Sequence, residues 1–319
     1  MILILTDAFD AHADVVVEKL KLRGMNFFRL NLDVSSLQTT SATYRAGSWI
    51  LKQEAKTIRL SKVKAVWCRR STVSLTAEQE HDFSNGFRLW KSEWNRSLFG
   101  CYSSLAEAFW LNHIRAATLA DNKFHQLNVA KSCGFKIPDF ITSNNKNDLV
   151  TFANNVPSVA LKFMSQDLYH SPDGNVLGLY VNRLTTEQIE AFGNLSENPV
   201  TLQTYIDKDF EVRYTAIEDN HLVCRISSQL SKKSNTDWRR YDIPNTPHLA
   251  IEPHPEIPDK VNKLLKCLNL SYGALDFVVD KDGEWWFLEI NSAGQWLWIE
   301  DLSGLKIADS IVNCLIDHT

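Results

Sequence analysis

The segment from Tyr272 to Asn291, YGALDFVVDKDGEWWFLEIN, constrains the fold of this chain more than any other. An Asp-Gly pair between two runs of alternating apolar residues is typical of a β-hairpin. With Asp282 and Gly283 as a two-residue turn, counting back along both strands places Asp276 directly opposite Glu289. The chain is therefore expected to contain an antiparallel sheet with two acids at facing positions.

The two faces of this hairpin differ in character. Asn291 follows Glu289 by two residues and so shares its face, whereas Phe277, Leu288 and Ile290 are expected to point to the other face, into a core. Facing acids repel each other unless a cation neutralises them. Carboxylate and amide oxygens are ligands that suit Mg²⁺. The hairpin thus predicts a magnesium site; solvated acids on an exposed sheet face are the alternative interpretation.

The remaining sequence alternates helical and strand patterns, which predicts an α/β protein. Residues 2–5 and 27–32 are apolar and flank a helical pattern over residues 14–23, a βαβ opening. A second unit begins near Asp121, and strand patterns dominate from Val200 onward. A chain of 319 residues is long enough for two or three packed lobes.

Composition narrows the classes of function. The net charge of −4 provides no overall basic field for nucleic acid, and the single basic run over residues 232–240 is too short to change that. No apolar run reaches the roughly 20 residues of a membrane span. The six cysteines are scattered, which favours free thiols in a reducing compartment. We therefore expect a cytoplasmic protein that binds neither nucleic acid nor membrane.

Several motifs resemble one known family. The hairpin pattern D-F-V-V followed by L-E-I-N resembles the magnesium site of the ATP-grasp superfamily. The extension LEINSAGQWLWIE resembles more specifically the graspetide synthetases, the microviridin-type peptide maturases, whose motif is usually written LEINPNGQW. AVWCRR (65–70), VALKF (159–163) and LQTYIDKDFEVRY (202–214) are similar to further family segments, so the resemblance covers nearly the whole chain. Ser292-Ala293 and Asn112-His113 depart from the family pattern without removing a ligand.

This resemblance implies a three-lobed ATP-grasp fold that binds ATP and Mg²⁺ between two sheets. The implied lobes are an N-terminal, Rossmann-like lobe (1–115), a central lobe (116–198) and a C-terminal lobe with the magnesium site (199–319). The implied metal ligands are Asp276, Glu289 and Asn291.

The resemblance also implies the residues around the nucleotide. Lys123 and Lys162 match lysines that contact phosphates, and a lysine inside an apolar strand such as VALKF needs a partner. The segment around adenine is implied to be Gln203, Tyr205 and Ile206, and either Asp207 or, preferably, Glu211 is expected to bind the ribose.

Three arginines are candidates for stabilising the transferred phosphoryl group, because a guanidinium matches the geometry of phosphate oxygens. They are Arg213, Arg225 and Arg239. Arg69, Arg70 and Trp296 are candidates for orienting the substrate; structural packing is the alternative for all three.

The implied function is a ligase that activates Asp or Glu side chains of a ribosomal precursor peptide, bearing a leader sequence, as acyl-phosphates. Ser, Thr or Lys side chains of the same peptide then form macrocyclic esters or amides. The family also suggests a homodimer. One alternative is an ATP-grasp ligase that adds an amino acid such as glutamate to a protein or small molecule. A non-catalytic nucleotide-binding regulator is another.

Overall fold

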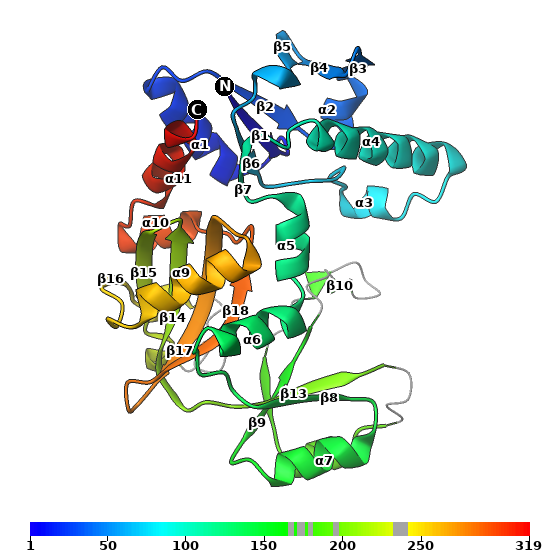
Figure 1. Cartoon of the computed structure of the whole chain (residues 1–319). Helices are drawn as coiled ribbons and strands as arrows, with labels where there is room; N and C mark the ends of the chain where they lie inside the picture. Colours follow the sequence, from blue (N-terminus) through cyan, green and yellow to red (C-terminus); the bar gives the residue numbers. More distant parts are fainter. Residues whose placement is uncertain (165–168, 171–175, 178–180, 194–197, 232–241) are drawn as a thin grey trace.

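A computed structural model of the chain describes residues 1–164, 169–170, 176–177, 181–193, 198–231 and 242–319. Three lobes follow one another along a long axis (Figure 1). The N-terminal lobe lies at one end, the C-terminal lobe in the middle, and the central part of the sequence at the other end. None of the described helices has the length and apolar character needed to cross a membrane.

The N-terminal lobe is built on a parallel sheet of order β2-β1-β6-β7. Its strands are β1 (Ile2–Thr6), β2 (Phe27–Asn31), β6 (Ala65–Cys68) and β7 (Phe109–Leu111). Helix α1 (Ala11–Leu22) connects β1 to β2 and begins at the N-cap Asp10, whose carboxylate accepts two backbone N–H groups. The predicted βαβ opening is confirmed.

This lobe also contains a second, antiparallel sheet of order β3-β4-β5. It comprises β3 (Ser41–Arg45), β4 (Ser48–Gln53) and β5 (Lys56–Arg59), followed by the 3₁₀ turn η1 (Leu60–Lys62). The helices of this region are α2 (Val34–Gln38), α3 (Ala77–Glu80) and the long α4 (Asn85–Ser103).

The C-terminal lobe contains an antiparallel sheet of order β16-β15-β14-β17-β18. Its strands are β14 (Lys208–Ile217), β15 (Asn220–Ile226), β16 (His248–Ile251), β17 (Tyr272–Asp280) and β18 (Trp285–Asn291). The 3₁₀ turns η2 (Ser228–Leu230) and η4 (Ile243–Asn245) lie between β15 and β16. This sheet contains the predicted hairpin.

One face of this sheet is covered by α5 (Ile114–Ala120), α6 (Lys123–Ser132) and α9 (Ile257–Leu268). Their apolar side chains share a core with β14, β17 and β18. Helices α5 and α6 therefore pack with the C-terminal lobe, although the predicted boundary at residue 116 assigns most of that segment to the central lobe. The predicted boundary followed the order of the sequence, whereas α5 and α6 pack where their apolar faces find a partner.

The opposite face of the same sheet is packed against helices at one end and lines a pocket at the other. At one end it packs on α10 (Leu297–Ser303) and α11 (Ile307–Asp317), and this core continues into β1, α1 and β6 of the N-terminal lobe. The N-terminal and C-terminal lobes thus share one hydrophobic core, with α1 beside α11 (Figure 1). At its other end the face is left for the pocket described below.

The central lobe has its own small core. A sheet of order β12-β9-β13-β8 is formed by β8 (Phe140–Ser143), β9 (Val159–Lys162), β12 (Asn182–Leu184) and β13 (Val200–Thr204). Helices α7 (Lys146–Asn154) and α8 (Thr186–Glu190) belong to this lobe, as does the short pair β10 (Tyr169–His170) and β11 (Val176–Leu177). Its sheet faces that of the C-terminal lobe across the pocket.

Candidate nucleotide and metal site

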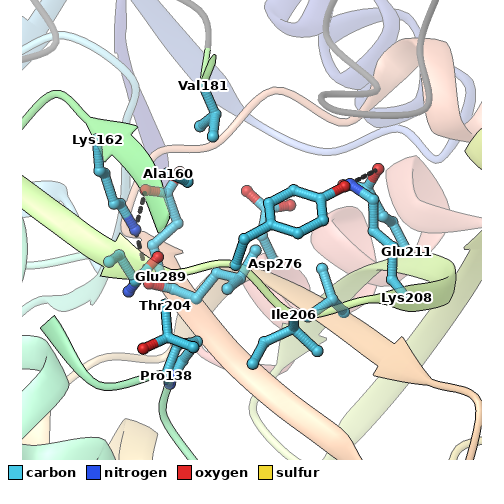
Figure 2. Close-up of a pocket in the computed structure, with 14 residues that line it drawn as sticks. Pro138, Ala160, Lys162, Val181, Thr204, Ile206, Lys208, Glu211, Asp276 and Glu289 are labelled. Atoms are coloured by element: carbon cyan, nitrogen blue, oxygen red, sulfur yellow. Dashed lines mark hydrogen bonds and ion pairs between the residues drawn. The ribbon is translucent and has the colours of Figure 1, made fainter. Parts of the chain in front are cut away.

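A pocket of about 660 Å³, partly open to solvent, lies between the central and C-terminal sheets (Figure 2). Its walls are mainly apolar with a few polar groups, which is typical of ligand sites. The lining residues come from both lobes and are Pro138, Ala160, Lys162, Val181, Gln203, Thr204, Tyr205, Ile206, Lys208, Glu211, Asp276, Val278, Leu288 and Glu289.

The hairpin register places Asp276 opposite Glu289, as predicted, although the turn differs from the expected one. Asp280 and Glu284 close a three-residue loop in which Gly283 has a positive φ of 82°. A β-bulge next to Asp276 then restores the predicted pairing. The two deviations cancel, so the acids face each other.

The bulge also overturns one prediction about the faces. Leu288 was expected to point into the core with Phe277 and Ile290, but it lines the pocket beside Glu289. A bulge places two successive residues of one strand opposite a single partner, so the strict alternation of side chains is interrupted there. Phe277 and Ile290 do lie in the core, as expected.

Each acid of the hairpin has a basic partner. Arg213 donates to both carboxylate oxygens of Asp276 at 2.8 and 2.9 Å. The Lys123 ammonium lies 3.1 Å, and that of Lys162 3.9 Å, from Glu289 Oε2. Burial opposes the charge of Arg213, but the Asp276 carboxylate beside it still raises the pKa of Arg213 above its ordinary value. The acids are therefore neutralised by three cationic side chains.

Asn291 completes this cluster. Its side-chain amide nitrogen Nδ2 donates to Asp276 Oδ2 and to Glu289 Oε1, each at 3.5 Å. Two carboxylates and one amide thus gather at one end of the pocket, and a flip of the Asn291 amide would turn its oxygen toward the two acids. This hard-oxygen donor set fits Mg²⁺, particularly beside phosphates that occupy the remaining coordination positions.

Local structure explains how the two lysines reach the cluster. Asn122 caps α6 by accepting the backbone N–H of His125, so Lys123 begins the helix with its side chain buried. Lys162 ends the apolar strand β9 and also donates to the backbone carbonyl of Leu288 at 3.2 Å. Two elements distant in sequence thereby present ammonium groups to the same carboxylate.

The end of the pocket away from the acids is mainly apolar, but two polar side chains of β13 reach it. Within the described residues, neither Gln203 Nε2 nor Thr204 Oγ1 has a hydrogen-bond partner, and both atoms are buried. Such atoms cost roughly 1–3 kcal/mol each if they stay unpaired. Tyr205 and Ile206 extend the wall, and the Arg183 guanidinium lies 4.3 Å from the centre of the Tyr205 ring.

The structure separates the two candidate ribose acids. Glu211 is buried in the pocket wall, where Lys208 Nζ lies 2.8 Å from its carboxylate and the Ser228 hydroxyl donates to it at 2.8 Å. The Asp207 side chain is 74% exposed, pairs with Lys281 and is outside the pocket lining. Glu211 is thus the acid in position to meet a ligand.

The three candidate arginines have different positions. Arg213 pairs with Asp276 in the cluster of hairpin acids, as described. Arg225 pairs with Val212, so it lies on the opposite face of the sheet, where its guanidinium stacks on the Phe210 ring at 3.9 Å. Its predicted contact with the reacting groups is therefore wrong, because one step along a strand reverses the face. Arg239 lies outside the described residues.

The candidates for orienting the substrate are mostly structural. Trp296 is 1% exposed in the core between the lobes. Arg69 is also buried; it pairs with Asp10 at 2.9 Å and donates to the Ala293 carbonyl at 3.0 Å. Structural packing, the alternative interpretation above, accounts for these two side chains, and neither lines the pocket. Arg70 stays half-exposed and pairs with Asp7.

Sequence reasoning missed Gln126, which holds the strand that carries Glu289 and Asn291. This fully buried side chain on α6 accepts the Ile290 N–H at 2.7 Å and donates to the Ile290 carbonyl at 3.2 Å and the Ala120 carbonyl at 2.8 Å. Ile290 separates Glu289 from Asn291 on the edge strand β18. No local sequence signal reveals this role, since a glutamine in a helix is ordinarily a surface residue.

Fold and site together define an ATP-grasp ligase. A family model described as the MvdD pre-ATP grasp domain matches residues 1–118. A Chryseobacterium gregarium RiPP-associated ATP-grasp ligase is 27% identical, with a TM-score of 0.88 over 100% of this chain and 97% of that one. Among the curated proteins searched, none matches.

Two Microcystis aeruginosa MRC enzymes are also similar. The macrocyclase MdnC is 26% identical, with a TM-score of 0.87 over 100% of both chains. The macrocyclase MdnB is 25% identical, with a TM-score of 0.79 over 99% of this chain and 98% of that one. The chain is thus an ATP-grasp ligase of the graspetide-synthetase type, which confirms the resemblance found in its motifs.

Proposed function

We propose that this enzyme uses ATP and Mg²⁺ to cross-link side chains of a ribosomally made precursor peptide. The observation that carries the proposal is the convergence of Asp276, Glu289 and Asn291 with Lys123 and Lys162 at one end of a largely apolar pocket. The Chryseobacterium ligase was solved with ADP, a leader and a core peptide, and MdnC with the precursor peptide MdnA. Both relatives support a peptide substrate.

The nucleotide is proposed to lie along the pocket. An adenine base between Ile206 and Leu288 would offer ring nitrogens to the unpaired amide of Gln203. Glu211 would accept the ribose hydroxyls. Lys123 and Lys162 would bind the phosphates, because two ammonium groups already meet at that end of the pocket.

Asp276, Glu289 and Asn291 would hold Mg²⁺, which supplies neutralisation of phosphate charge. A carboxylate oxygen of the peptide attacks the γ-phosphorus, and the bond to the bridging oxygen breaks to release ADP. A hydroxyl or amine of the same peptide then attacks the acyl carbon, loses its proton and expels phosphate. Arg213 and Arg239 are proposed to stabilise the charge on the transferred group.

The assembly and the lobe boundaries are further proposals. We propose a homodimer, tested by sedimentation of the purified chain. We also propose three lobes, with α5 and α6 belonging to the C-terminal lobe because they share its core. A leader sequence of the precursor is proposed to bind outside the pocket.

Co-expression with a short neighbouring open reading frame rich in Thr and Asp or Glu tests the function. Mass spectrometry should show the peptide lighter by one water per ring, and turnover in vitro should release ADP and phosphate. Glu289→Gln is the matched control and should leave the peptide unmodified. A peptide that gains the mass of an amino acid would favour the amino-acid ligase, and nucleotide binding without ADP release would favour a regulator.

A further inference from the structure

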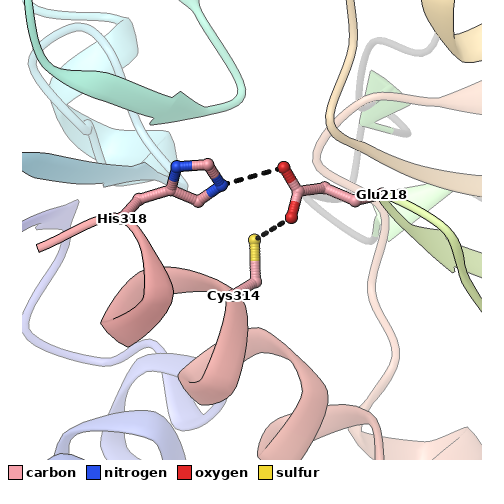
Figure 3. Close-up of side chains that lie close together, drawn as sticks. All are labelled: Glu218, Cys314 and His318. Atoms are coloured by element: carbon pink, nitrogen blue, oxygen red, sulfur yellow. Dashed lines mark hydrogen bonds and ion pairs between the residues drawn. The ribbon is translucent and has the colours of Figure 1, made fainter.

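Three metal-ligating side chains meet far from the pocket, at the junction of the C-terminal and N-terminal lobes (Figure 3). Cys314 lies on α11 and His318 caps that helix four residues later, so both side chains occupy one face. Glu218 lies in the turn between β14 and β15, which the packing of α11 brings alongside. The sequence places more than 90 residues between Glu218 and the other two, so no sequence pattern reveals the cluster.

The three donor atoms converge closely. The Glu218 carboxylate contacts both partners, with Oε1 2.9 Å from His318 Nε2 and Oε2 3.5 Å from the Cys314 thiol. All three donor atoms lie within 4.8 Å of one another. Ligand atoms around a tetrahedral zinc ion lie roughly 3.5 Å apart, given metal–ligand distances of about 2.0–2.3 Å. The observed spacing needs only small side-chain adjustments to reach that geometry.

Neighbouring contacts orient these side chains. The His318 imidazole stacks on the Phe109 ring of β7 with centroids 3.6 Å apart and planes 5° apart. The Glu218 backbone N–H donates to the Ser271 carbonyl at 2.8 Å. Cys314 is buried, whereas the side chains of His318 and Glu218 are 36% and 42% exposed. An ion can therefore enter from the solvent side, and water can fill a fourth position.

We propose that Glu218, Cys314 and His318 bind one divalent transition-metal ion, with Zn²⁺ as the natural occupant. Thiolate, imidazole and carboxylate together form a donor set that suits zinc. Magnesium prefers ligands that are all oxygen atoms. The ion would link α11 to the β14–β15 turn, and the stacked Phe109 would extend that link to the N-terminal sheet. The site shares no residue with the nucleotide pocket, and Glu218 lies at the opposite end of β14 from Glu211.

Cobalt(II) titration of the chelator-treated full-length protein tests this proposal, because a thiolate ligand gives Co²⁺ a ligand-to-metal charge-transfer absorption. We expect one Co²⁺ per chain, displaced by one Zn²⁺. Cys314→Ser should abolish the charge-transfer band. His318→Gln and Glu218→Gln should keep it but weaken affinity by roughly tenfold or more. Cys267→Ser, which changes an exposed thiol on α9 outside the cluster, should behave like the natural protein.

Thermal unfolding provides a second measurement that does not depend on the spectrum. Zn²⁺ should raise the Tm of the natural protein and of Cys267→Ser, and it should leave the Tm of Cys314→Ser unchanged, because only binding to the folded state stabilises it. The proposal is overturned if no charge-transfer band forms, if the band persists in Cys314→Ser, or if it disappears in Cys267→Ser. Nucleotide turnover should continue in Cys314→Ser, which separates this site from the proposed function.

Discussion

Replacing Gln126 tests whether a single buried amide holds Glu289 and Asn291, the proposed metal ligands, in place. Strand β18 forms one edge of its sheet, and the Gln126 side chain pairs with the N–H and carbonyl of Ile290 as a neighbouring strand would. Gln126→Ala removes these two hydrogen bonds and the one to Ala120. The backbone groups left behind are buried, so we expect the free energy of unfolding to fall by about 3–5 kcal/mol.

This loss is large compared with a total stability of roughly 5–15 kcal/mol, but the chain should still fold. Turnover should fall roughly a hundredfold, because an error of about 1 Å in Glu289 or Asn291 is sufficient for that effect. Denaturant unfolding measures the first quantity, and ADP release at saturating ATP measures the second.

Two further variants identify the cause. Gln126→Met keeps the side-chain volume without the hydrogen bonds, so it should be nearly as damaging as Gln126→Ala. Gln188→Ala makes the same chemical change at an exposed helix cap, where the Gln188 side chain accepts one backbone N–H, and should cost less than about 1 kcal/mol. If Gln126→Met restores stability and turnover, the cavity and not the lost hydrogen bonds explains the defect, and the assigned role is refuted.

Three other predictions follow from the site. Asp276→Asn and Glu289→Gln should abolish Mg²⁺-dependent ADP release while the circular dichroism spectrum stays near native. Asp276→Ala should also lower the free energy of unfolding by about 3–5 kcal/mol, because the buried Arg213 loses its carboxylate partner. Lys162→Ala should weaken ATP binding measured by calorimetry, whereas Arg239→Ala should lower single-turnover rate with little change in ATP affinity; poor binding with normal turnover for the arginine variant would contradict that division. Burial, reinforced by the nearby Arg69 cation, lowers the pKa of His12 from 6.5 to about 4, so the unfolded chain binds the proton first and His12 should lower the stability of the fold as pH decreases from 6.5 to 4; His12→Gln should flatten this pH dependence in denaturant titrations.

The hairpin pattern was sufficient to predict which acids face each other. Alternating apolar residues around Asp-Gly define a hairpin, and a facing pair of acids within it demands cations, whatever the rest of the chain does. The pairing of Asp276 with Glu289 predicted from that pattern is observed, although a bulge next to Asp276 is needed to offset the longer turn. Lys162, at the end of an apolar strand, likewise predicts a partner for its charge, and in the structure its ammonium lies 3.9 Å from Glu289 Oε2.

Contacts between distant segments fixed which face each side chain occupies and which residues become buried. A bulge turns Leu288 toward the pocket, and strand pairing places Arg225 on the far face of the sheet. Packing between the N-terminal and C-terminal lobes buries Trp296. Gln126 acquires its role only when α6 covers the open edge of β18. These outcomes depend on contacts between segments far apart in the chain, because local patterns specify an element's period but not the partner against which it packs.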